Sequence, residues 1–160
     1  MKKYYIILIL TLTVKLCTAQ QSNDISELAR FIISDVRLNN ADVTQQYLDA
    51  NAYLVFYRIN GSEQIYFAGV WPKKGTQSYG RVYNVETTQN VGTQTEYRNE
   101  TISFKWSYAN SYDNKVGTAS VILGLVYKPN GTAFVLTMRT ETLDESVYRG
   151  YLSGSLDLGH

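Results

Sequence analysis

The sequence contains one histidine and one cysteine, and both lie close to its ends. His160 is the last residue, and chain ends are usually mobile. We therefore expect neither a Ser-His-Asp or Cys-His triad nor a histidine-based zinc site. Cys17 lies in a segment that we expect to be removed, so the remaining chain would have no disulfide and no thiol nucleophile. We predict no metal and no cofactor.

The first 19 residues have the pattern of a secretory signal peptide. Two lysines precede an apolar run over 4–14, which is too short to span a bilayer, and small residues lead up to Ala19. We expect cleavage after Ala19, export to the periplasm or the cell exterior, and one domain over 20–160 without a stable membrane span. Retention as an anchor and lipidation of Cys17 are the alternatives.

Charge gives no reason to expect nucleic acid as a partner. The chain has 15 basic and 14 acidic residues, and three of the basic residues but none of the acidic ones lie within 1–19. The exported part is therefore slightly acidic, whereas nucleic-acid-binding proteins usually carry a basic patch. We therefore expect the partner to be a small molecule, a glycan or another protein. The sequence does not determine the oligomeric state.

The segment from Asp24 to Val36 predicts an amphipathic helix. Its apolar residues recur at spacings of three and four, which places them on one stripe. They are Ile25, Leu28, Ala29, Ile32, Ile33 and Val36. Asp24 and Glu27 form a start that resembles a capping box, and we expect Ile32, in the middle of the stripe, to be buried. A short second helix is expected over 41–48.

From Ala52 onward the apolar period changes to two, which is typical of strands. The expected strands cover about 52–59, 63–71, 78–87, 96–108, 117–128, 132–142 and 147–153. Asn-Gly pairs at 60–61 and 130–131 indicate hairpins, and no helical pattern separates the strands, so the sheet should be antiparallel. The predicted fold class is α+β, with one amino-terminal helix packed on a curled antiparallel sheet of about seven strands. A lipocalin-like up-and-down β-barrel is the alternative.

The first two expected strands are apolar on both faces. A helix of this length is only about 20 Å long, so it cannot cover both faces of a seven-stranded sheet. Either the sheet wraps around itself, or a tyrosine-rich face stays open.

Two groups of residues are candidates for ligand binding. Tyr57, Tyr66 and Arg81 belong to the tyrosine-rich face, where each tyrosine offers a rigid ring with a polar tip. The alternative for this group is that the rings form ordinary cross-strand pairs, which stabilise sheets.

The second group lies in the segment 106–114, which is rich in aromatic and polar residues. The candidates in it are Tyr108, Asn110, Tyr112 and Asp113. Loops on a rigid sheet often carry binding residues, whereas a hairpin turn with locally satisfied Asn and Asp is the alternative. Trp106 alternates with Ile102 and Phe104, so we expect it in the core.

The sequence is best interpreted as an exported, non-catalytic binding or interaction module. A carrier of a small apolar ligand is the first alternative, and an internal cavity of several hundred Å³ would favour it. A carboxylate-dependent hydrolase is the second, and it would need two convergent carboxylates. No pair stands out among its candidates, which are Glu86, Glu96, Glu100 and Glu141.

Overall fold

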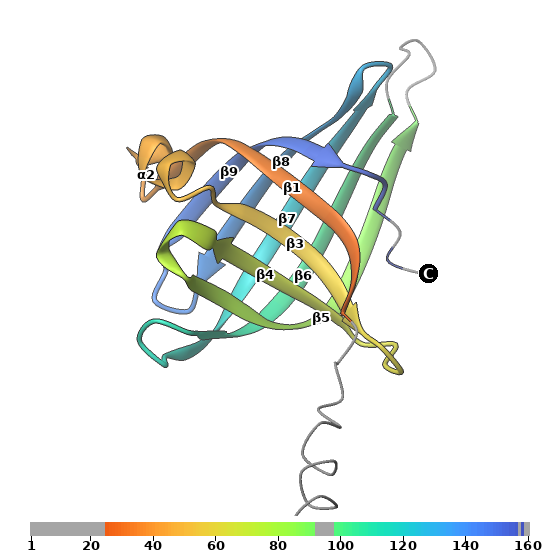
Figure 1. Cartoon of the computed structure of the whole chain (residues 1–160). Helices are drawn as coiled ribbons and strands as arrows, with labels where there is room; N and C mark the ends of the chain where they lie inside the picture. The colour runs from red at the N-terminus through yellow and green to blue at the C-terminus, as the bar shows by residue number, and fades with distance from the viewer. Residues whose placement is uncertain (1–24, 92–97, 157, 159–160) are drawn as a thin grey trace, which may run out of the picture.

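The computed structural model describes residues 25–91, 98–156 and 158, and most of them lie in strands. Eight long strands of this described part form one antiparallel sheet (Figure 1). They are β1 (Ile25–Leu38), β3 (Tyr53–Ile59), β4 (Ile65–Trp71), β5 (Thr76–Val91), β6 (Arg98–Asn110), β7 (Val116–Lys128), β8 (Gly131–Thr140) and β9 (Glu145–Ser153). The shorter elements are β2 (Ala41–Asp42), the helix α2 (Thr44–Asp49) and the 3₁₀ turn η1 (Pro72–Lys74).

The sheet closes into an up-and-down barrel. Each long strand pairs with the next one along the chain, and β1 pairs with both β3 and β9. The last strand therefore joins the first, and none of the long strands in the described residues is left as an edge. The barrel alternative is confirmed, and the α+β arrangement of a helix packed on a sheet is wrong.

The predicted helix over 24–36 is strand β1, apart from Asp24, which lies outside the described residues. The register of β1 shifts between Glu27 and Ala29 against β3, and between Ile33 and Asp35 against β9. A β-bulge inserts an extra residue and so changes which side chains face inward.

The bulges explain why β1 resembles a helix in its apolar spacing. The buried residues of this strand are Ala29, Phe31, Ile33 and Val36, which are not evenly spaced by two. Phe31 is 0% exposed although it lies off the predicted helical stripe, whereas Ile32 is 48% exposed. The expectation that Ile32 is buried is therefore wrong.

The seven strands expected from Ala52 onward are all present, with β5 longer than predicted. The expected start of the fourth of them, at 96, lies outside the described residues. Alternation within β6 is as predicted, because Ile102, Phe104 and Trp106 are each 3% exposed. The short second helix is confirmed in part, since α2 begins at Thr44 rather than at residue 41.

Apolar side chains fill the middle of the barrel. Phe31 packs edge-to-face on Phe134 and on Phe56, with ring centroids 5.0 and 5.8 Å apart. Phe67 and Leu136 are also 0% exposed. The barrel is therefore a packed core at its centre, and any internal space lies toward its ends.

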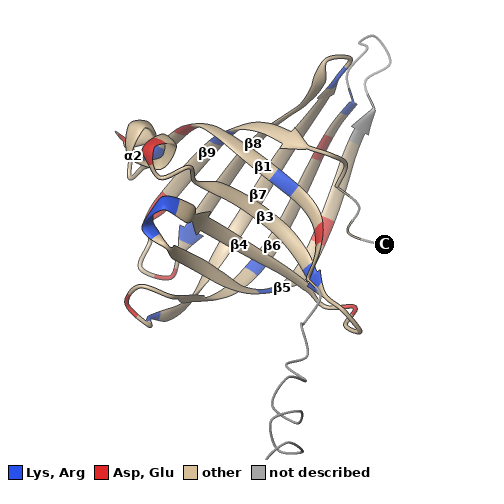
Figure 2. Ribbon diagram, viewed as in Figure 1, with Lys and Arg blue, Asp and Glu red and all other residues tan. Residues whose placement is uncertain are grey.

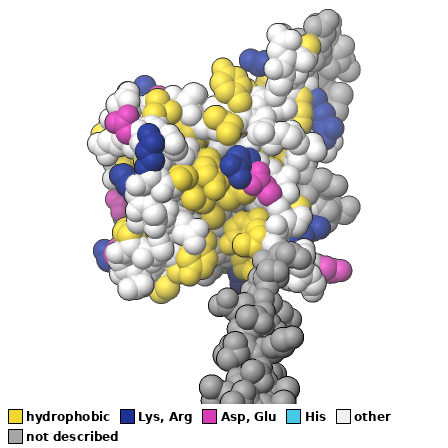
Figure 3. Space-filling view, viewed as in Figure 1, with side chains coloured by type: hydrophobic (Ala, Val, Ile, Leu, Met, Phe, Trp, Pro, Cys, Tyr) yellow, Lys and Arg dark blue, Asp and Glu magenta, His cyan; other side chains and the backbone are white. Residues whose placement is uncertain are grey.

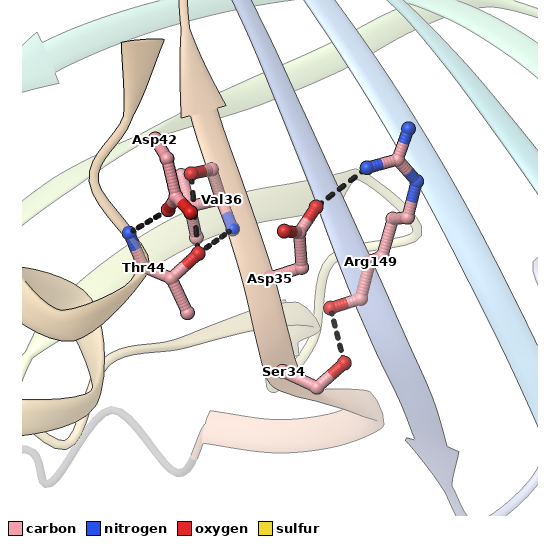
Figure 4. Close-up of polar contacts among 6 residues, drawn as sticks. All are labelled: Ser34, Asp35, Val36, Asp42, Thr44 and Arg149. Carbon is pink, nitrogen blue, oxygen red and sulfur yellow. Dashed lines mark hydrogen bonds and ion pairs between the residues drawn. The ribbon is translucent and has the colours of Figure 1, made fainter.

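The contact between β1 and β9 closes the barrel (Figure 4). Asp35 forms an ion pair with Arg149 across these strands, and the Ser34 hydroxyl donates to the Arg149 carbonyl at 3.3 Å. Gly150 lets the backbones approach, because a Cβ at this position would lie 1.9 Å from the Ile32 carbonyl oxygen.

Among the residues that the structure describes, no helix has the length and apolar character needed to cross a membrane. The signal peptide expected over 1–19 lies outside them.

Candidate functional site

A cavity of about 510 Å³ opens at the end of the barrel that carries α2. Because neighbouring strands run in opposite directions, this end gathers the last residues of β1, β4, β6 and β8. Its lining residues are Leu38, Gln46, Tyr47, Leu54, Phe67, Gly69, Trp71, Lys74, Thr76, Ser78, Trp106, Tyr108, Asn110, Tyr112, Met138, Thr140, Ser146 and Tyr148. We call this space the inner cavity.

Aromatic rings form the walls and floor of the inner cavity. Trp106 lies against Tyr108, with ring centroids 4.9 Å apart, and its indole N–H donates to the Phe67 carbonyl at 3.0 Å. Tyr47 meets Trp71 edge-to-face at 5.8 Å. Both tryptophans of the chain therefore line this cavity, so their fluorescence reports on whatever enters it.

Helix α2 carries Tyr47 to the edge of the cavity, and hydrogen bonds to β1 and β2 hold the start of the helix (Figure 4). The Val36 N–H donates to the Thr44 hydroxyl oxygen at 2.9 Å, and the Thr44 N–H donates to Asp42 at 2.9 Å. Hydrogen bonds at its start and the contact of Tyr47 with Trp71 thus hold a six-residue helix that has no buried residue, although an isolated helix this short is not stable in water.

Burial raises the pKa of three of the phenols that line the inner cavity. Burial is the main cause that raises the pKa of Tyr148, and the nearby Tyr47 and Tyr112 phenols act in the same direction. Burial likewise raises the pKa of Tyr47 and of Tyr108. Near neutral pH these phenols are therefore hydrogen-bond donors and acceptors without charge.

Polar groups at the rim are tied to one another. The Ser78 hydroxyl donates to the Asn110 side-chain oxygen at 2.7 Å, and Ser78 is only 7% exposed. The Ser111 hydroxyl oxygen accepts the Gln77 N–H at 2.8 Å. These bonds fasten the β6–β7 turn to the start of β5 and set the width of the opening.

The candidates from the segment 106–114 are brought together only in part. Tyr108, Asn110 and Tyr112 line the inner cavity. Asp113 does not line it. Instead, its carboxylate accepts the Lys115 N–H at 3.0 Å and forms an ion pair with the Lys115 ammonium at 3.5 Å.

The tyrosine-rich face forms a second, outer groove of about 680 Å³ on the outside of β3 to β6. Tyr57 and Tyr66 stack there, with centroids 5.4 Å apart and ring planes at 22°. Arg81 donates to the Gln64 side-chain oxygen at 2.9 Å. Hydrophobic side chains gather in the middle of this face (Figure 3), and the floor is apolar, since Ala68 is 3% exposed.

The carboxylates proposed for hydrolysis do not converge on either space. Among the described residues, no carboxylate lines the inner cavity, and only Glu27 lines the outer groove, where it is paired with Arg30. Glu100 accepts a hydrogen bond from Tyr127 at 2.8 Å, away from both. Glu86 and Glu141 are exposed, and Glu96 lies outside the described residues. The described part of the chain also has no group of three His, Cys, Asp or Glu side chains placed to hold a metal ion.

Sequence reasoning missed several lining residues, above all Tyr47, Trp71, Lys74 and Tyr148. They lie on α2, β4, η1 and β9, and they come together only because the sheet closes. The one relevant sequence signal is that the first two expected strands are apolar on both faces, and of these four residues only Trp71 lies on one of those strands.

We compared the chain with family models, with curated proteins and with solved structures, and none of them matches it. The functional argument therefore rests on the geometry of the two spaces.

Proposed function

We propose that this protein binds a small, largely apolar molecule in the inner cavity and acts as a binding protein or carrier. The observation that supports the proposal is the cavity itself, because its 510 Å³ lies within the range of about 300–1,000 Å³ that is common for small-molecule sites. Its lining is mainly aromatic and aliphatic, with a few polar groups at the rim. Such a lining binds an apolar body and orients a polar end.

The test uses the two tryptophans as reporters. N-phenylnaphthylamine, a neutral apolar dye, should bind with energy transfer from tryptophan, because both indoles line the inner cavity. Thr76→Phe adds a ring to the lining and should weaken dye binding about tenfold, equivalent to roughly 1.4 kcal/mol.

Gln77→Phe is the matched control, because this neighbouring residue lines the outer groove. It should leave the energy transfer and the affinity close to wild type. Dye binding that Thr76→Phe does not weaken, or an absence of energy transfer from tryptophan, would count against the inner cavity as the site.

The proposal includes export, on the grounds of the lysines, the apolar run and the small residues within 1–19. Mass spectrometry of the exported protein should find a chain that begins at Gln20. A retained Met1, or a lipid on Cys17, would contradict cleavage at this position.

The outer groove supports a second candidate function, recognition of a glycan or peptide by an exposed aromatic surface. The stacked Tyr57 and Tyr66 rings over an apolar floor favour it, since tyrosine combines a flat apolar face with a polar tip. Tyr66→Ala should abolish retention on a glycan or peptide array and leave dye binding in the inner cavity unchanged. Equal retention of the variant and the wild type would exclude this surface.

A further inference from the structure

Lys74 is the charged residue of the inner cavity. Among the described lining residues it is the only one with a formal charge, and no carboxylate lines the cavity with it. The described part of the chain provides no ion pair for its ammonium group. An uncompensated cation next to an aromatic cavity favours a ligand with a negative charge.

The turn that carries Lys74 is held in place at the mouth of the barrel. Pro72 begins η1, and Gly75 ends it in the left-handed conformation at φ 63°, with its N–H donating to the Pro72 carbonyl at 3.0 Å. The Lys73 N–H donates to the Ala50 carbonyl at 3.2 Å, which ties η1 to the end of α2. Lys73 itself does not line the cavity.

Neutral donors line the cavity together with the ammonium group. They are the phenols of Tyr47, Tyr112 and Tyr148, and the rings of Tyr47 and Tyr148 meet edge-to-face with centroids 5.9 Å apart. Phenolic O–H groups and ammonium groups are both donors, and hydrogen bonds to an ionised acceptor are stronger than those between neutral groups. The oxygens of an acidic head group therefore suit this end of the cavity.

Glu141 and Asp144 lie across the mouth from Lys74, whereas Asp49 lies near η1 at the end of α2, where it accepts a hydrogen bond from Gln45 at 2.8 Å. The β4–β5 connection, which contains Lys74, and the β8–β9 turn are separated by four strands in either direction around the eight-stranded barrel. The β8–β9 turn contributes Glu141 and Asp144, so the turns at this end carry charges of both signs (Figure 2). Asp113, on the turn between them, is paired with Lys115.

We propose that the molecule bound in the inner cavity is an amphipathic organic acid, with its anionic head at Lys74 and its apolar body against Trp106. This proposal rests on the proposed function, because it names the class of ligand for the same cavity. The head lies toward η1, because Lys74 is the one charged residue among the described lining residues.

The test compares decanoate, decanol and decylamine, which share one apolar body and differ in the charge of the head. Binding is followed by tryptophan emission at neutral pH, because none of the three absorbs where tryptophan does. Decanoate should bind the wild-type protein about tenfold more tightly than decanol, as expected for a hydrogen-bonded charged head. Decylamine should bind most weakly.

Lys74→Met keeps the length of the side chain and removes its charge. It should weaken decanoate binding about fivefold and leave decanol binding unchanged. Lys73→Met removes the same charge from the adjacent position and should leave the ratio of the two affinities as in the wild type.

The outcomes separate this inference from the function on which it rests. Equal affinities for decanoate and decanol, or equal losses in Lys73→Met and Lys74→Met, would overturn the anionic head and leave binding in the cavity intact. Failure of N-phenylnaphthylamine and of all three amphiphiles to change tryptophan emission would overturn the proposed function itself.

Discussion

Phe31 and Ile32 are neighbours on β1 that point to opposite sides of the barrel wall, and their truncation tests the strand directly. Phe31 is 0% exposed and packs edge-to-face on Phe56 and Phe134. Phe31→Ala removes the buried ring and leaves a cavity, so we expect a loss of about 3–5 kcal/mol in the free energy of unfolding. Folded domains are stable by only about 5–15 kcal/mol, so this is a large share of the total.

Ile32→Ala removes a side chain that is 48% exposed on the outer surface. The expected loss is about 1 kcal/mol or less, from β-propensity and partial burial. Urea unfolding, followed by far-ultraviolet circular dichroism and tryptophan emission, measures the free energy of unfolding of both variants. The two values are comparable if the free energy falls with urea concentration at the same slope in each. Phe31→Leu serves as a milder variant if Phe31→Ala does not fold.

The variant that loses more free energy of unfolding distinguishes a strand from a helix over 24–36. A helix over 24–36 would bury Ile32 and leave Phe31 off the apolar stripe, so it predicts that Ile32→Ala is the more damaging change. If Ile32→Ala destabilises the protein as much as Phe31→Leu or more, the alternation of β1 described above is refuted.

Gly150→Ala should destabilise the barrel by about 1–3 kcal/mol, because its Cβ would lie 1.9 Å from the Ile32 carbonyl oxygen. Gly124→Ala is the control in the same thermal melts, because its Cβ would lie 3.7 Å from the Val135 carbonyl oxygen. Burial, followed by the hydrogen bond and charge of Glu100, raises the pKa of Tyr127 to about 12. This group therefore contributes stability that is complete below the unfolded pKa, near 10.0, and lost as the pH rises through about 12. Glu100→Gln should lower the phenol midpoint in an ultraviolet titration, and an unchanged midpoint would exclude the contact.

The strands after Ala52 could be predicted because apolar side chains that face the core alternate along them with side chains that face outward. In β6 one face carries Ile102, Phe104 and Trp106 and the other carries polar residues, so the period of two is unambiguous. Strand β1 could not be predicted in the same way. Its two bulges shift the inward face twice within 14 residues, and a shifted period of two resembles the spacing of a helix.

The candidate site could be predicted where its residues are close in sequence. Tyr108, Asn110 and Tyr112 lie on one strand end and its turn, and all three line the inner cavity. Tyr47 and Tyr148 are far apart in the chain, and they meet only after β9 has paired with β1. Such a contact depends on closure of the sheet, which no local pattern specifies.

Because β3 and β4 are apolar on both faces, the sequence allowed either a sheet that wraps around itself or a tyrosine-rich face that stays open. The structure has both features: the sheet is closed, and its tyrosine-rich outer face is open. Closure of the barrel buries the inner face, where Leu54, Phe56 and Phe67 are at most 2% exposed. It leaves the outer face without a second layer, so Tyr57 and Tyr66 cover the floor of the outer groove themselves. The core is complete without the outer face, but Tyr57 and Tyr66 lie opposite each other in the register of β3 and β4 and so form a cross-strand pair of the kind that stabilises a sheet. A loss of stability in Tyr66→Ala together with unchanged retention on the array would assign the pair to folding, whereas lost retention at unchanged stability would assign it to the proposed recognition surface.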